Sequence, residues 1–205
     1  MRQSLRTHLG KLIVRMICTY VLALGLIALT QGCTWLPKVD QQEYCYAAYV
    51  FEAEVKETPT LEYSYYKHDI AVKKAYKFDG NKEDVLAFRT LYGDGPGYSC
   101  GEEILTKGKS YLIYANKSDG KLHISQYRSM ENVNNADIER MTTKYDCNCT
   151  IVFNYSKLLG NGPGIELPPP TMNECNVPTK YCSRGAYCKR NSDGQCTWGT
   201  LGDCY

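Results

Sequence analysis

Residues 44–55 read YCYAAYVFEAEV, and within them apolar or aromatic residues recur at every second position. Successive side chains of a β-strand point to opposite sides, so alternation places one set of residues on a common face. Here that face would carry five residues: Ala47, Tyr49, Phe51, Ala53 and Val55. The stretch therefore predicts a β-strand that packs one face into a core.

Two stretches downstream also predict strands. YKHDIAVKKAYKF (66–78) puts Tyr66, His68, Ile70 and Val72 on one face, and the turn residues Asp79 and Gly80 end it. DVLAFRTLY (84–92) predicts a third strand, and GDGPG (93–97) after it predicts an irregular loop.

SYLIYAN (110–116) and KLHISQY (121–127) predict a hairpin, because Ser118-Asp119-Gly120 between them is a turn sequence. ADIERMTTKY (136–145) is the one good helix, with Asn135 as its N-cap and Asp137 in its first turn. About five strands and a flanking helix predict a mainly β fold, a small closed barrel of the OB type, over residues 33–147.

The first 32 residues are typical of a secretory signal peptide. They carry four basic residues and no acidic one, an apolar run at 16–29 that is short for a membrane span, and small residues at Thr30 and Gly32. The alternatives are an uncleaved N-terminal anchor and, more weakly, a bacterial lipoprotein, since LTQGC fits a lipobox poorly. Cleavage after Gly32 would leave a secreted chain of 173 residues that begins at Cys33.

Cysteine usage agrees with export. Of the 11 cysteines, Cys18 falls in the leader, and the ten that remain suit five disulfides in an oxidising compartment. Six of the ten lie within residues 148–205, where little is periodic, so this segment is expected to form a small cysteine-rich C-terminal domain held by crosslinks. Three sequons, at Asn116, Asn148 and Asn154, are candidate glycosylation sites.

Charge and motifs exclude several function classes. Without the leader, the 24 Lys and Arg against 22 Asp and Glu become 20 against 22, and no Lys/Arg block is present, so a nucleic-acid partner is not expected. The mature histidines, His68 and His123, fall at strand positions, and Glu102 and Glu103 are interpreted as solvated loop charges. With no zinc signature, nucleophile elbow or phosphate loop, an enzyme is not expected.

Cys33 has chemistry of its own if it begins the mature chain. Its free α-amine, with a reference pKa of about 7.7–8.0, and its carbonyl oxygen form a five-membered chelate on a metal ion. Such a pair can replace the water that fills the open position of a catalytic zinc. Alternatively, Cys33 is an ordinary half-cystine near a chain terminus, without a ligand role.

The segment CTWLPKVDQQEYC (33–45) resembles the start of mature tissue inhibitors of metalloproteinases, whose pattern is C-x-C-x-P-x-H-P-Q-x-x-[FIV]-C. Cys33, Pro37, Gln41 and Cys45 match at the family spacing. Further matches follow in order along the mature chain: HDIAVKKAYK (68–77), Tyr98-Ser99-Cys100-Gly101, KLHIS (121–125), the 136–145 helix, CTIVF (149–153) and GQCTW (194–198). The resemblance implies a netrin-like OB-fold domain followed by the cysteine-rich domain.

The chain departs from the family pattern at one of its disulfides and at its His-Pro dipeptide. Trp35 stands where the family has its third-position cysteine, and Tyr127 stands where that cysteine's partner falls, so both halves of one disulfide are absent together. The His-Pro of the pattern is Val39-Asp40 here. These departures leave open how firmly residues 35–40 are held.

The resemblance implies a secreted inhibitor of zinc metalloendopeptidases of the matrix metalloproteinase type, with no cofactor of its own. Cys33 would bind the zinc of the target enzyme, and Thr34 would point into its main specificity pocket. Trp35, Leu36 and Pro37 would lie along the substrate cleft. On the other side of the cleft, the flanking residues would be Gly97, Tyr98 and Ser99. A monomer is expected, with extracellular matrix as a possible further partner and no membrane contact.

The same resemblance implies the disulfides Cys33–Cys100, Cys45–Cys147 and Cys149–Cys196. Cys188 would pair with Cys175 or Cys182, and Cys204 would take the other, giving Cys175–Cys204 or Cys182–Cys204. A second functional hypothesis is a netrin-like extracellular matrix or binding module that kept the fold and lost inhibition. The absent disulfide and the tyrosine-rich surface motivate it.

Overall fold

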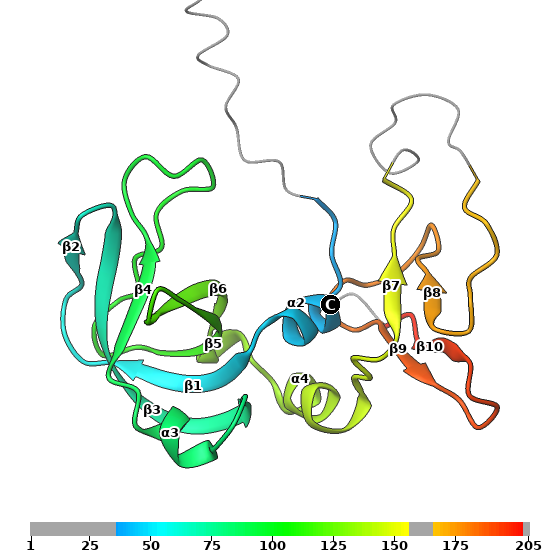
Figure 1. Cartoon of the computed structure of the whole chain (residues 1–205), viewed down its shortest axis with the longest axis horizontal. Helices are drawn as coiled ribbons and strands as arrows, with labels where there is room; N and C mark the ends of the chain where they lie inside the picture. The colour runs from blue at the N-terminus through cyan, green and yellow to red at the C-terminus, as the bar shows by residue number, and fades with distance from the viewer. Residues whose placement is uncertain (1–35, 156–165, 203–205) are drawn as a thin grey trace, which may run out of the picture. The chain divides into compact units, whose positions relative to one another are not determined.

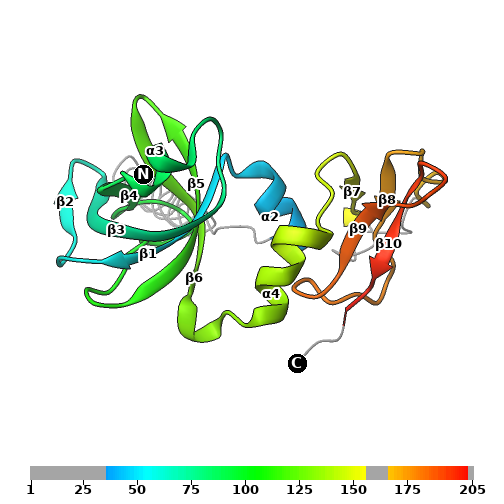
Figure 2. The ribbon, with the colours of Figure 1, turned by 90° about the horizontal axis from the view of Figure 1, so that it is seen from below.

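A computed structural model of the chain describes residues 36–155 and 166–202. It is mainly β, and its largest element is a closed five-stranded barrel (Figures 1 and 2). Around the barrel the strands run in the order β1 (Tyr49–Val55), β5 (Ser110–Ser118), β6 (Lys121–Ser129), β4 (Thr90–Asp94) and β3 (Tyr65–Lys77). Antiparallel pairing of β3 with β1 closes the barrel, and the short β2 (Thr60–Glu62) adds to the free edge of β3.

Alternation in β1 builds the barrel core as the sequence predicts. Tyr49, Phe51, Ala53 and Val55 are all buried in one cluster with residues of the other four strands. Ala47 does not share their face, because the chain at 44–46 is helical and Ala47 packs in a separate cluster with Val50 and Met141. The predicted strand is thus confirmed from residue 49 onward and wrong before it.

The predicted hairpin is also confirmed. β5 and β6 pair in antiparallel register, with Ser118 opposite Lys121. Between them Asp119 and Gly120 have φ values of 52° and 74°. Two successive residues with positive φ match the right-handed twist of the flanking strands, which explains an Asp-Gly sequence at this point.

Two short helices replace predicted extended chain. α2 (Asp40–Tyr46) begins where the Gln42 side chain accepts a hydrogen bond from the backbone N–H of Val39, and acidic residues in its first turn favour the helix dipole. α3 (Lys82–Leu86) begins at Asn81, whose side chain accepts from the Glu83 N–H at 3.2 Å. The predicted strand at 84–92 is therefore wrong up to residue 89, and β4 extends into the predicted loop through Gly93 and Asp94.

The predicted helix at 136–145 is present in two parts. α4 (Asn135–Glu139) continues into a π-helical turn at Arg140–Lys144, and a 3-10 turn, Met130–Asn132, precedes it. Its N-cap is Asn134, one residue before the predicted Asn135, and the Asn134 side chain accepts from the Asp137 N–H at 3.0 Å. Asp137 lies in the first turn as predicted.

The C-terminal segment contains two pairs of short strands. β7 (Thr150–Val152) runs parallel to β8 (Glu174–Asn176), and β9 (Tyr187–Arg190) is antiparallel to β10 (Cys196–Thr200). Their shared core is small, and half of its buried residues are cysteines: Val39, Cys149, Ile151, Phe153, Cys175, Ala186, Cys188 and Cys196. Crosslinks occupy the place that larger apolar side chains take in the barrel.

Three disulfides are seen among the described residues. Cys45–Cys147 and Cys149–Cys196 have the pairing that the resemblance implies. Cys175–Cys188 selects one of the two alternatives for Cys188, and the option Cys175–Cys204 is therefore wrong. Cys182 is also disulfide-bonded, and Cys204, its expected partner, lies outside the described residues.

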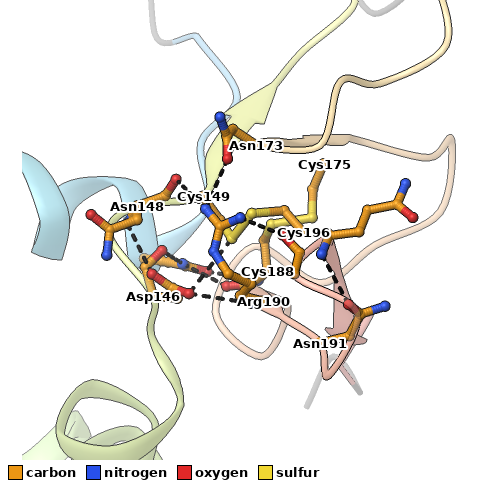
Figure 3. The surroundings of a disulfide bond; sticks show 12 residues. Asp146, Asn148, Cys149, Asn173, Cys175, Cys188, Arg190, Asn191 and Cys196 are labelled. Carbon is orange, nitrogen blue, oxygen red and sulfur yellow. Dashed lines mark hydrogen bonds between the residues drawn. A yellow bond between two sulfur atoms is a disulfide. The ribbon is translucent and has the colours of Figure 1, made fainter.

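Arg190 supports this crosslinked region (Figure 3). Its backbone N–H donates to the Asp146 carboxylate at 3.2 Å, and its guanidinium donates to the Asn173 side chain at 2.9 Å. Through its backbone and its side chain, Arg190 therefore joins β9 to the segments around Asp146 and Asn173, next to the disulfides.

Candidate functional site

Two segments carry the residues expected to meet a target enzyme. Of the first, Cys33, Thr34 and Trp35 lie outside the described residues. Leu36 is 39% exposed and Pro37 is half-buried, and neither lies in regular secondary structure. The exposed Leu36 side chain is therefore available for contact with a partner.

The chain directly after Pro37 is firmly anchored. Val39 is fully buried in the C-terminal core, and the backbone N–H of Asp40 donates to the Ser183 carbonyl at 2.8 Å. The Asp40 carboxylate accepts from Arg128 at 2.8 Å. The Val39-Asp40 departure therefore leaves these two residues well held.

Gln41 is the most completely bonded side chain of this anchor. It is 1% exposed, and its amide donates to the carbonyls of Cys188 at 2.8 Å and Asp146 at 2.9 Å. Its side-chain oxygen accepts from the Cys188 N–H at 2.7 Å. A buried amide with three partners ties the N-terminal segment to β9, and removing it would leave buried backbone groups unpaired.

The far end of α2 is fixed as well. Lys77 of β3 donates to the carbonyls of Tyr44 at 2.7 Å and Cys45 at 2.8 Å, which caps the C-terminal end of the helix with a cation. Burial lowers the pKa of Lys77. Together with the Cys45–Cys147 disulfide, these bonds make residues 39–46 a rigid base for the residues that precede them.

The second segment follows β4. Gly97 is exposed with φ +93°, a conformation that favours glycine; Ser99 is exposed and Tyr98 is half-buried. The Gly101 N–H donates to the Tyr98 carbonyl at 3.2 Å, which closes a tight turn. Cys100 is disulfide-bonded, and its expected partner Cys33 lies outside the described residues.

The chain on either side of this turn is pinned at Asp94 and Glu103. The Glu103 N–H donates to the Asp94 carbonyl at 2.7 Å, and the Asp94 N–H donates to the Glu103 carboxylate at 2.9 Å. Burial raises the pKa of both carboxyl groups. The interpretation of Glu103 as a solvated loop charge is therefore wrong, whereas Glu102 is exposed and accepts from the Tyr66 hydroxyl at 2.8 Å.

His68 lies behind this pair. It is fully buried in β3, with its Nε2 2.9 Å from the Glu103 carbonyl oxygen, to which it donates. Its Nδ1 has no hydrogen-bond partner. Burial lowers the pKa of His68, so the ring is neutral at pH 7. The interpretation of His68 as a barrel residue is confirmed.

One cluster among residues 36–155 and 166–202 brings metal-ligating atoms together, namely the sulfurs of Cys149, Cys188 and Cys196. Each of them is in a disulfide, so none is a thiolate that can bind a metal ion. This cluster is structural.

The family model described as tissue inhibitor of metalloproteinase matches residues 31–198. The chain belongs to the tissue inhibitor of metalloproteinase family. That family consists of extracellular protease inhibitors, and the closed barrel seen here is consistent with its netrin-like OB fold. The match begins two residues before Cys33 and covers both segments described above.

The departures from the tissue inhibitor of metalloproteinase pattern have a structural account where the chain is described. Tyr127 of β6 packs against the barrel core, with its ring 5.9 Å from that of Tyr111 in an edge-on contact. An aromatic pair thus occupies the place of the family's half-cystine and adds apolar burial there. Trp35, the other departure, is outside the described residues.

The three sequons differ in their surroundings. Asn148 is exposed in a turn, whereas Asn116 is half-buried and its side chain accepts from the Ala48 N–H at 2.8 Å. Asn154 is half-buried too. Within the described residues, no helix has the length and apolar character needed to cross a membrane.

Sequence reasoning missed the supporting residues of both segments. Gln41 matches the family pattern, but nothing in its spacing reveals that its partners are backbone groups 105 and 147 residues away. Glu103 and His68 carry no motif. The glycine-rich stretch 93–97 is the one local signal for a close approach of chain segments.

Proposed function

We propose that the mature protein begins at Cys33 and inhibits zinc metalloendopeptidases of the matrix metalloproteinase type by chelating their catalytic zinc. The family match over residues 31–198 carries this proposal, because the family consists of metalloproteinase inhibitors and the matched region includes Cys33. The protein brings no metal or other cofactor of its own. The zinc belongs to the target enzyme.

The chemistry rests on the first residue. With the leader removed, the Cys33 α-amine gives up its proton readily to a metal ion, since its reference pKa is about 7.7–8.0. The amine and the Cys33 carbonyl oxygen would then occupy the position where the enzyme holds its hydrolytic water. Without that water the zinc has no nucleophile to activate, and peptide hydrolysis stops.

The neighbouring residues would supply affinity and selectivity. Thr34 enters the main specificity pocket, and Trp35, Leu36 and Pro37 lie along the substrate cleft. Gly97, Tyr98 and Ser99 flank the other side, joined to the first segment through a Cys33–Cys100 disulfide. Tyr98 would tune selectivity by its bulk, because it replaces a smaller family residue.

The rigid base at residues 39–46 supports this proposal. A chain terminus that binds an enzyme must lose its conformational freedom, at a cost of roughly 1–2 kcal/mol per ordered residue. Gln41, Asp40 and the Cys45–Cys147 disulfide restrain the chain within a few residues of the inhibitory segment. Part of the ordering is thus complete before binding.

The proposal also covers where the protein acts, its oligomeric state and its glycosylation. We expect a monomer secreted to the extracellular space or matrix after removal of residues 1–32. Among the sequons, the exposed Asn148 is the most accessible to a glycosyltransferase, with Asn116 and Asn154 as the further candidate sites.

The test is chemical modification of the α-amine. Secreted protein whose N-terminal sequence starts at Cys33 is titrated against an active matrix-type metalloproteinase, beside protein acetylated at the α-amine and protein with one extra N-terminal Ala. We expect stoichiometric inhibition by the first and none by the other two. A chain with one extra residue at the C-terminus is the matched control and should inhibit fully. Equal inhibition by acetylated protein would refute the chelation mechanism.

The alternative, a netrin-like module without inhibitory activity, is favoured by one observation. Trp35 and Tyr127 replace both cysteines of a family disulfide, so the inhibitory segment lacks one of its family restraints. A mature N-terminus at any residue other than Cys33 would support this alternative, because the amine would then be displaced from the zinc.

A further inference from the structure

The loop between β4 and β5, which carries Gly97 to Ser99, leaves the barrel and returns to it at one reciprocal contact (Figure 1). Asp94 and Glu103 exchange two hydrogen bonds, one between backbone groups at 2.7 Å and one from the Asp94 N–H to the Glu103 carboxylate at 2.9 Å. A bond to a carboxylate is stronger than one between neutral groups. The two ends of the segment 95–102 are therefore closed on each other.

Gly93 makes this closure sterically possible. A β-carbon at position 93 would lie 2.7 Å from the Glu103 carbonyl oxygen and 2.8 Å from the Glu103 Cβ, both too close for a real contact. His68 supports the same carbonyl from the barrel interior through its Nε2–H, 2.9 Å away. Leu105, fully buried in the core, fixes the chain two residues further on.

The other end has a second restraint. The Gly95 N–H donates to the Ser64 carbonyl at 3.0 Å, and a β-carbon at Gly95 would meet that oxygen at 2.5 Å. The segment 96–102 is thus restrained at both ends: Gly95 lies against the backbone of Ser64, and Glu103 lies against the backbone of Gly93 and Asp94. This closure depends on particular residues, because a side chain at Gly93 or Gly95 would clash with neighbouring backbone and because the Glu103 carboxylate accepts from the Asp94 N–H.

We propose that Glu103 is a positioning residue for inhibition: its carboxylate accepts from the Asp94 N–H, His68 holds its backbone carbonyl, and this closure sets the ends of the loop that presents Gly97, Tyr98 and Ser99 to the enzyme. This rests on the proposed function, since it assigns these three residues to the enzyme contact. Glu103 itself does not touch the enzyme. It acts by reducing the number of conformations that the loop must lose on binding.

Three variants test this assignment. Glu103→Ala removes the acceptor of the Asp94 N–H, and Glu103→Gln restores a neutral oxygen acceptor at the same place. Glu102→Ala removes the same charge from the adjacent, exposed residue and is the matched control. For each protein, hydrogen exchange at the Asp94 and Glu103 amides is measured together with the inhibition constant against a matrix-type metalloproteinase and the thermal unfolding midpoint.

We expect Glu103→Ala to speed exchange at both amides and to weaken inhibition at least about tenfold, the scale of one hydrogen bond to a charged group. Glu103→Gln should recover most of both effects, and Glu102→Ala should leave exchange at Asp94 unchanged. A purely structural role for Glu103 would lower the unfolding midpoint in proportion to any loss of inhibition, with no rescue by Gln.

The outcomes separate the two proposals. Wild-type inhibition that Glu103→Ala leaves intact would overturn the positioning role and spare the proposed function. Unchanged exchange in Glu103→Ala would overturn it too, because the carboxylate would then not hold the Asp94 amide. Wild-type protein that exchanges slowly at Asp94 but inhibits no metalloproteinase would refute the proposed function, and the use of Glu103 for inhibition with it.

If Glu103→Ala fails to fold, Gly93→Ala provides the second route. It leaves the carboxylate in place and separates the two ends by steric contact. We expect the same pairing of faster exchange and weaker inhibition. Full inhibition by this variant, with fast exchange at Asp94, would also overturn the positioning role.

Discussion

The barrel and the C-terminal segment are stabilised by different kinds of interaction. The barrel buries 13 residues in its main cluster, eleven of them on the five strands, and all 13 are aliphatic or aromatic, with no cysteine among them. The C-terminal cluster buries eight residues, of which four are half-cystines. The barrel strands together enclose a core that apolar side chains fill, and this burial stabilises the barrel. The C-terminal strands are only three to five residues long, and disulfide bonds supply much of the stability that apolar burial supplies in the barrel.

The largest effect should come from removing a side chain of the barrel core, which tests whether apolar burial stabilises the barrel. Phe51→Ala deletes a fully buried ring and is expected to cost about 3–5 kcal/mol, a large share of the stability of a small domain. Hydrogen exchange should rise sharply across β1, β3 and β5, and less within the disulfide-bonded C-terminal strands. Phe78→Ala, at a 39% exposed phenylalanine outside the core, is the control and should change little.

Loss of a crosslink should produce the opposite pattern. Replacing Cys175 and Cys188 together by serine removes a disulfide that closes a 13-residue separation, at an expected cost of about 2–5 kcal/mol. We expect faster exchange in β9 and β10, while β1 and β5 remain protected. Equal loss of protection in the barrel strands would mean that the two regions unfold as one unit.

A smaller effect should come from the bridge between the regions. Gln41→Ala leaves the Cys188 N–H and the carbonyls of Cys188 and Asp146 without this partner, which is expected to cost about 1–3 kcal/mol. When denaturant unfolding is monitored by hydrogen exchange, the barrel strands and the C-terminal strands should then have different unfolding midpoints. Gln195→Ala, the same change at an exposed residue just before β10, should leave both midpoints unchanged.

The smallest effect expected is the pH dependence that His68 gives the barrel. Because burial lowers its pKa in the folded protein, the unfolded chain binds a proton first as pH falls below about 6.5, and the free energy of unfolding decreases. One pH unit below that value the loss is at most about 1.4 kcal/mol, the limit for a ring that stays neutral in the folded protein. The measurement is urea unfolding at pH 7.5 and 5.5, with His68→Gln as the reference.

Gln at position 68 retains a side-chain N–H for the Glu103 carbonyl and does not titrate. The difference between the two proteins isolates His68 from carboxyl groups such as Asp94 and Glu103, whose raised pKa values act in the opposite direction at lower pH. An identical decrease in both proteins would show that His68 does not contribute.

Strands β1, β3, β5 and β6 were predictable, because apolar residues alternate in β1 and in the first part of β3, and because Asp119-Gly120 between β5 and β6 is a strong turn signal. Helices α2 and α3 were not, since they contain seven and five residues and depend on capping contacts and on partners distant in sequence. The segments proposed to contact the enzyme were located through the family resemblance alone. Gln41 and Glu103, which restrain those segments, hydrogen-bond to backbone groups. Because nearly every residue type carries these backbone groups, the sequence does not indicate which residues are the partners.

The Cys45–Cys147 disulfide also has a consequence for biosynthesis. Its two cysteines are 102 residues apart, so at a translation rate of about 5–20 residues per second Cys45 emerges roughly 5 to 20 s before its partner exists. During that interval the nascent chain carries a thiol whose native partner has not been synthesised, so in an oxidising compartment this thiol can pair with another cysteine. The order in which cysteines leave the ribosome therefore makes the yield of active protein depend on disulfide isomerisation, a demand set by the position of one residue near the start of the chain.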